Sequence, residues 1–177
     1  MRYFLALSLL FLLQTQTASA QQADWQTPPS SDKQSEKSEK KQPIGSPRQV
    51  ALHFVKHTGV NRNFVYILLH STQTSPVVQS LYGQHPKETV DRAVRHGIQP
   101  VVRKYFEEWE INLAATYLDF FSAEQLHSLA TLRTRSPYFQ VFQAKSPEIA
   151  PAMRKRTGSL LNEATNEAIQ IIIKSLN

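Results

Sequence analysis

Two histidines four residues apart have the type and spacing that suit metal chemistry. His53 and His57 fall in a stretch with helical periodicity, where side chains four positions apart share a face. No glutamate lies between them, so the general base of a His-Glu-x-x-His zinc protease is missing. A metal site would need a third ligand, such as His70, His85 or His96. We interpret the pair as half-exposed histidines that flank a buried phenylalanine, and we predict no metal site.

Other catalytic chemistry finds no better support in the sequence. No Gly-x-Ser-x-Gly motif occurs, and no spacing of serine, histidine and acidic residues indicates a catalytic triad. We expect Glu107, Glu108 and Glu110 to lie on a solvated helix face. The absence of cysteine excludes disulfides, thiolate catalysis and cysteine-bound metals. We predict no catalytic residue and no cofactor, and an enzyme with an unrecognised site stays an open alternative.

Basic side chains supply a candidate anion-binding site. Arg133 and Arg135 would form one patch with Arg154, Lys155 and Arg156 if the fold brings the two groups together. The alternative is scattered charge that keeps the protein in solution. No recognised nucleic-acid-binding motif is present, so we expect no nucleic-acid partner.

Aromatic side chains supply a second candidate, an apolar interaction patch. Tyr138, Phe139 and Phe142 fall close together on a short predicted helix. They either belong to the core or form an exposed surface for homodimerisation or an apolar ligand. The sequence leaves these alternatives open.

Serine–proline pairs predict where helices begin. Serine suits the N-cap, and proline suits the first helical position, where its missing N–H would have no partner. We expect Gly59 and Gly97 to end helices. We predict helix starts at Ser46-Pro47, Ser75-Pro76, Ser136-Pro137 and Ser146-Pro147.

The strongest helical pattern covers residues 100–121, where apolar residues recur every three or four positions. A capping box, Ser122-Ala-Glu-Gln125, opens the next helix. No segment shows the sustained alternation of a strand. The sequence therefore predicts an all-α fold, a single helical bundle of about six to eight helices. The predicted helices cover residues 47–57, 61–70, 75–82, 86–96, 100–121, a stretch from 122, a short helix over 138–142, and 147–176.

The N-terminal segment predicts export. Residues 3–13 are almost entirely apolar, and Ala18-Ser19-Ala20 is typical of a signal-peptidase site. We expect a signal peptide over residues 1–20, cleavage after Ala20, and a periplasmic or secreted protein with no transmembrane segment. Residues 21–46 are rich in Ser, Lys, Glu and Pro and are predicted to form a disordered polar linker. The all-helical domain is predicted to cover residues 47–177.

Charge is divided unevenly along the chain, which carries a net charge of +6. The linker is neutral, with four lysines and four acids, whereas residues 47–177 hold fifteen basic and ten acidic residues. A basic exported domain suits anionic polymers or headgroups of the cell envelope, although net charge does not determine specificity.

Three short motifs resemble those of a known family. Residues 120–126, Phe-Phe-Ser-Ala-Glu-Gln-Leu, are followed by Ser136-Pro137 and then by Ser146-Pro147-Glu148-Ile149. In this order they resemble the bacterial exported helical family catalogued as domain of unknown function 2059. The similarity would cover nearly all of residues 47–177. It implies an exported, all-helical domain with no established activity, and it assigns no catalytic residue.

These observations favour an exported, non-enzymatic domain with a binding or interaction role at the cell envelope. Its expected partner is an envelope protein or an anionic envelope polymer. A carrier of an apolar ligand in an aromatic-lined cavity is the alternative, beside the enzyme with an unrecognised site.

Overall fold

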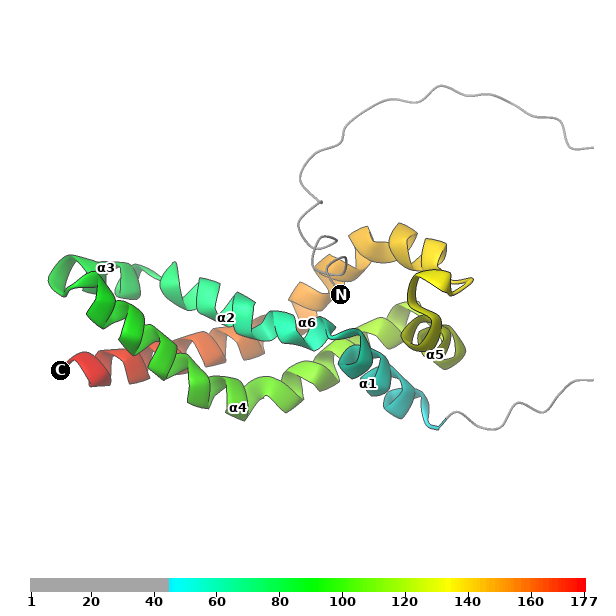
Figure 1. Ribbon diagram of the computed structural model, residues 1–177, viewed down its shortest axis with the longest axis horizontal. Coiled ribbons are helices and arrows are strands. Elements are labelled where there is room, and N and C mark those ends of the chain that lie inside the picture. Colours follow the sequence, from blue (N-terminus) through cyan, green and yellow to red (C-terminus); the bar gives the residue numbers. More distant parts are fainter. Residues whose placement is uncertain (1–44) are drawn as a thin grey trace, which may run out of the picture. The chain divides into compact units, whose positions relative to one another are not determined.

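The computed structural model describes residues 45–177, which are almost entirely helical (Figure 1). Six α-helices and two short 3-10 helices make up this part of the chain, and it contains no strand. The predicted all-α fold is confirmed. The predicted signal peptide and nearly all of the predicted linker lie outside the described residues. The elements are α1 (Pro47–Thr58), η2 (Val60–Arg62), α2 (Asn63–Gln73), α3 (Pro76–Gln84), α4 (Lys87–Phe120), α5 (Ala123–Leu132), η3 (Arg133–Arg135) and α6 (Phe139–Leu176).

Local capping chemistry determines three of the helix starts. The Ser46 and Ser122 hydroxyls accept from the backbone N–H three residues later, and a glutamine side chain completes each capping box. Ser75 accepts in the same way from the Val78 N–H. Gly59 ends α1 with a φ of 76°, a conformation that favours glycine. These four predictions are confirmed.

Several predicted boundaries are wrong because two helices run through prolines. Pro100 lies inside α4, so the predicted helices over 86–96 and 100–121 are one helix of 34 residues. Pro147 and Pro151 lie inside α6, which has 38 residues. Ser136-Pro137 forms a turn in which Ser136 Oγ accepts from the Tyr138 N–H, and α6 begins just after it.

Packing of buried side chains beside the prolines explains why the helices continue. An interior proline costs about 3 kcal/mol. Val94 and Val101 flank Pro100 and are both fully buried, and each contributes about 1.5 to 3 kcal/mol by leaving water. In α6, Ile149 lies between Pro147 and Pro151 and is 5% exposed. Tertiary packing therefore outweighs the local preference for a break.

The two long helices pack against each other at Gly97, which is buried inside α4. A Cβ at this position would lie 2.8 Å from Ile172 Cγ1 and 3.3 Å from the Ala168 carbonyl oxygen of α6. The prediction that Gly97 ends a helix is therefore wrong. Glycine is needed here because the backbones of α4 and α6 come too close for a side chain.

We call one end of the domain the aliphatic end. There α2 and α3 pack against the first half of α4, and α2 also contacts α6 (Figure 1). Its core consists of small and branched aliphatic side chains, all with at most 7% of their surface exposed. They are Val78, Val90, Ala93, Val94, Val101, Ala164, Ala168 and Ile172.

We call the other end the aromatic end, where α1 and α5 pack together and α1 contacts α4. Phe54 of α1 meets Tyr117 of α4 edge to face, with ring centroids 4.9 Å apart. Phe142 of α6 contacts both of these rings, and it stacks on Phe121 at 5.6 Å. Phe64 and Trp109, stacked at 5.0 Å, join α2 to α4.

Two similar polar clusters join helices near the aliphatic end. Asp91 accepts from Lys87 at 2.6 Å and from the Tyr82 hydroxyl of α3 at 2.7 Å. Glu167 of α6 accepts from Lys104 at 2.5 Å and from the Tyr105 hydroxyl at 2.9 Å. In each cluster the lysine and then the tyrosine lower the carboxyl pKa by hydrogen bonding.

None of the helices within residues 45–177 combines the length and the apolar character needed to cross a lipid bilayer.

Candidate functional site

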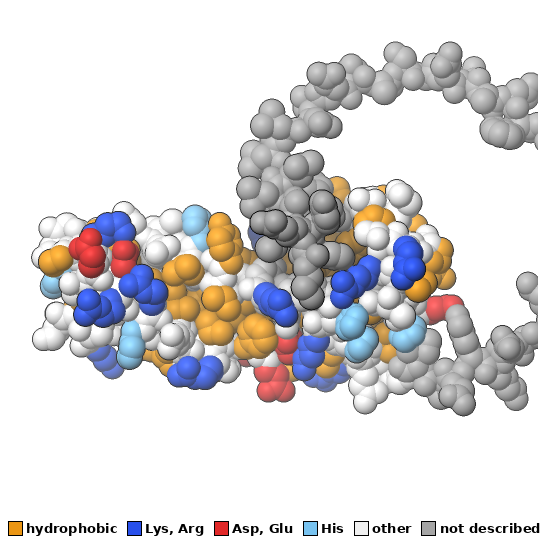
Figure 2. Space-filling view, in the orientation of Figure 1, with side chains coloured by type: hydrophobic (Ala, Val, Ile, Leu, Met, Phe, Trp, Pro, Cys, Tyr) orange, Lys and Arg blue, Asp and Glu red, His pale blue; other side chains and the backbone are white. Residues whose placement is uncertain are grey.

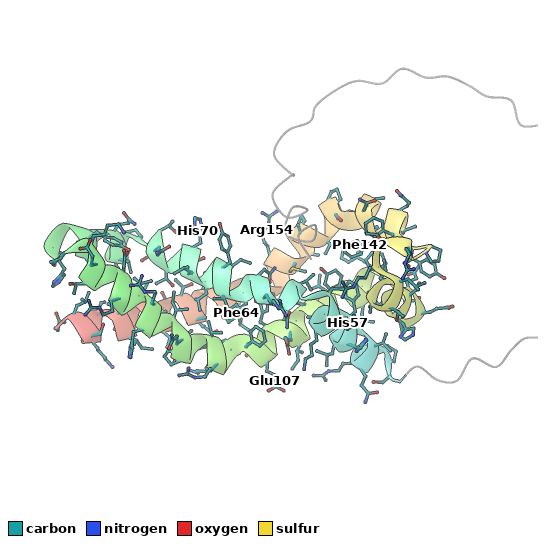
Figure 3. The ribbon with its side chains drawn as sticks, in the orientation of Figure 1. His57, Phe64, His70, Glu107, Phe142 and Arg154 are labelled. Carbon is teal, nitrogen blue, oxygen red and sulfur yellow. The ribbon has the colours of Figure 1, made fainter. Side chains whose placement is uncertain are left out.

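The predicted anion-binding residues occupy two separate places. Arg133 and Arg135 belong to η3, and both are exposed. Arg154 and its two basic neighbours lie about four helical turns into α6, roughly 20 Å of helical rise from its start (Figure 3). The exposed Lys155 follows Arg154, and Arg156 is held by Asp119 of α4, with Nη2 3.0 Å from Oδ2. The helical distance keeps the two groups apart.

The predicted apolar patch is partly core. Phe142 points from α6 toward the rings of α1 and α4 (Figure 3). Tyr138 and Phe139 are half-buried and also pack against the core. Two large hydrophobic side chains are exposed at this end, Leu132 and Val141, at 40% and 41% exposure. Phe142 is thus part of the ring cluster at the aromatic end.

The histidine pair lies on the solvent side of α1. His53 and His57 are both exposed and stack with ring centroids 5.2 Å apart. Within residues 45–177 no three His, Asp or Glu side chains come together in a group able to hold a metal ion. Phe54, between the histidines, is buried as expected.

Glu110 is the polar residue that the sequence interpretation placed wrongly. Glu107 and Glu108 are exposed, and Glu107 lies on the outer side of α4 (Figure 3). Glu110 instead has only 6% of its surface exposed. The signal was available, because Glu110 precedes the buried Leu113 and Ala114 by three and four residues and shares their face.

Glu110 belongs to a polar clamp between α4 and the corner that joins α1 to α2. The Asn61 side-chain N–H donates to Glu110 Oε1 at 2.7 Å, and Lys56 Nζ lies 3.3 Å from Oε2. Next to it, the Trp109 indole N–H donates to Asn63 Oδ1 at 3.2 Å. Lys56 and Asn61 compensate the cost of burying the carboxylate, so the clamp positions α1 against α4.

The sequence interpretation also missed a division of charge between elements. No aspartate or glutamate occurs from Ser46 to Lys87, which includes α1, η2, α2 and α3. Every acidic residue of the described chain lies on α4, α5 or α6. A scan for acid-free stretches, rather than for basic runs, would have found this segment.

The acid-free elements expose basic and histidine side chains. Arg48 and Arg62 are exposed and take part in no ion pair within residues 45–177. His53, His57 and His70 are exposed as well. We call the exposed side of α1, η2, α2 and α3 the acid-free face. In Figure 1 these elements follow one another across the domain, from α1 at the end that carries α5, through α2, to α3 at the opposite end. Their exposed side is the candidate interaction site.

No family model matches the chain, and no curated protein and no solved structure matches it either. The resemblance to the exported helical family therefore stays a prediction.

Proposed function

We propose that this chain is an exported, non-enzymatic helical domain that binds a partner at the cell envelope through the acid-free face. The observation that carries the proposal is the division of charge, with exposed arginines on α1 and η2 and every acid on α4, α5 or α6. Arg48 and Arg62 would attract an anionic partner. The acids beside the face, Asp91 at Tyr82 and Glu110 at Asn61, are each paired with a lysine. The signal-peptide pattern of residues 1–20 supports the location.

Packing of the aromatic end supports an interaction role over a carrier role. Phe54, Tyr117, Phe121 and Phe142 have each other as neighbours, with centroid separations of 4.9 to 6.2 Å. Such rings stabilise the fold through mutual contact. A carrier needs rings that line a space for its ligand.

Export is tested by fractionating cells that express the full chain and sequencing the N-terminus of the recovered protein. We expect an exported protein that begins at Gln21. A Leu10→Arg variant interrupts the apolar run and should remain in the cytosol with Met1. Recovery of the wild-type protein in the cytosol with Met1 intact would contradict the proposal.

Binding at the envelope is tested by measuring how much of the exported protein sediments with envelope fractions. We expect an Arg48→Glu/Arg62→Glu variant to lose this association and an Arg92→Glu/Arg95→Glu variant on α4 to keep most of it. Both pairs of arginines are exposed and change the net charge equally. Equal losses would mean that net charge, and not the face, determines association.

A further inference from the structure

Exposed hydrophobic side chains are concentrated on the acid-free face. Of the five large hydrophobic residues exposed in residues 45–177, three lie on α2 and α3: Val65, Tyr66 and Val77. Tyr66 is 70% exposed, and its ring stacks parallel to that of His70 at 6.5 Å. Hydrophobic side chains gather on the surface over α2 (Figure 2). The elements of the face therefore combine exposed arginines on α1 and η2 with exposed apolar side chains on α2 and α3, and they contain no acidic residue of their own.

This combination fits the surface of an anionic bilayer. Lysine and arginine are attracted to the negative potential of such a surface, and any aspartate or glutamate would be repelled. Tyrosine suits the headgroup region, because its ring is apolar and its hydroxyl remains hydrated. A soluble polyanion would use only the charges and would leave Tyr66, Val65 and Val77 in water.

We infer that the acid-free face docks onto anionic lipid headgroups, with Arg48 and Arg62 attracting the phosphates and Tyr66 entering the headgroup layer. This inference rests on the proposed function and names its partner. The domain would lie on the bilayer without crossing it, since its helices within residues 45–177 lack a membrane-spanning stretch. Peripheral membrane binding combines the burial of apolar surface with electrostatic attraction to anionic headgroups.

The experiment uses the exported protein, purified with its N-terminus sequenced, and vesicles of phosphatidylcholine with or without phosphatidylglycerol. We expect co-sedimentation with the anionic vesicles, weakening as salt is raised, and little with neutral vesicles. Arg48→Gln/Arg62→Gln should lower the affinity about tenfold or more. The matched control, Arg92→Gln/Arg95→Gln, removes the same charge from α4 and should change the affinity less than threefold.

A second pair of variants tests the apolar contribution. Tyr66→Ser should lower the affinity for anionic vesicles severalfold, whereas Leu132→Ser, at the other end of the domain, should not. Both positions are exposed, and circular dichroism melting would verify that each variant folds. Binding that depends on both arginines and tyrosine supports the docking surface.

Three results would overturn the inference. Equal binding to neutral and anionic vesicles would show that binding does not depend on headgroup charge. Equal losses of affinity in the α4 control would show that the acid-free face is not the binding surface. Tight binding to soluble polyphosphate with no effect of Tyr66→Ser would indicate a polyanion instead of a bilayer. N-terminal sequencing tests export independently of the vesicle assay. A chain that is not exported keeps Met1, whether or not it binds vesicles.

Discussion

At the aliphatic end α4 and α6 come so close that Gly97 has no room for a side chain, whereas at the aromatic end rings fill the space between helices. The first arrangement depends on small and branched residues that let backbones approach. The second depends on large rings that contact each other edge to face or offset. Both ends involve α4 and α6. At one end the two helices meet through backbone atoms at Gly97, and at the other they meet through the rings of Tyr117 and Phe142.

The comparison teaches which kind of change each end tolerates. The aliphatic end lacks space, so it should be most sensitive to added atoms. The aromatic end derives its stability from large buried surfaces, so it should be most sensitive to removed atoms. The two ends should therefore respond differently to substitutions that add volume and to substitutions that remove it.

The largest expected effect is the loss of a ring at the aromatic end. Phe54→Ala removes a side chain that is 2% exposed and contacts two other rings. We expect a loss of about 4 kcal/mol in the free energy of unfolding, measured by urea denaturation. Phe139→Ala, at a half-buried position, should cost roughly half as much. Equal losses of unfolding free energy in the two variants would mean that Phe54 contributes no more to stability than the half-buried Phe139.

Alkaline pH should also weaken the aromatic end. Burial raises the pKa of Tyr117 to about 12 from 10.0. The unfolded chain releases this proton first, so stability should fall as pH rises from about 10 to 12, by about 2 to 3 kcal/mol. Tyr117→Phe should make the alkaline decline shallower. An unchanged decline in urea titrations of this variant would contradict the assignment.

Adding one methyl group at Gly97 should test whether the aliphatic end is sensitive to added volume. Gly97→Ala places a Cβ against Ile172 and the α6 backbone. The overpacking cost exceeds the gain in helix propensity, so we expect a net loss of about 1 kcal/mol. Gly158→Ala is the matched control, because no atom lies within 4 Å of its Cβ and alanine should there stabilise α6 by up to about 1 kcal/mol. Thermal melts showing the same sign for both variants would refute the close approach.

The smallest effect concerns the polar cluster that joins α4 to α6. Tyr105→Phe removes one hydrogen bond to Glu167, and we expect a loss of less than about 1 kcal/mol at neutral pH. The pKa of Glu167 is lowered from 4.5 in the folded protein, so its contribution is present above that pH and disappears as pH falls. The difference in melting temperature between variant and wild type should therefore shrink at acid pH. A difference that is independent of pH would exclude the carboxylate as the partner.

The proposed interaction surface could be predicted from the sequence only in part. The surplus of basic residues is evident in the sequence, and it directs attention to runs such as Arg154-Lys155-Arg156. In the structure, Arg156 of this run forms an ion pair with Asp119. The acid-free stretch was equally visible in the sequence. Its role in the proposal depends on how α1, α2 and α3 are placed around α4 and on the exposure of Tyr66, which periodicity in single helices does not establish.

Local sequence patterns were enough to predict the all-α fold, the capping boxes at Ser46 and Ser122 and the end of α1 at Gly59, because each depends on residues within one or two turns. Tertiary structure decided the rest. Pro100 lies within a continuous helix, Gly97 lets α6 approach α4 closely, and Glu110 is buried with Lys56 and Asn61 as its partners. Each of these outcomes depends on side chains far away in the sequence, whose packing energy exceeds the local preferences that the sequence reveals.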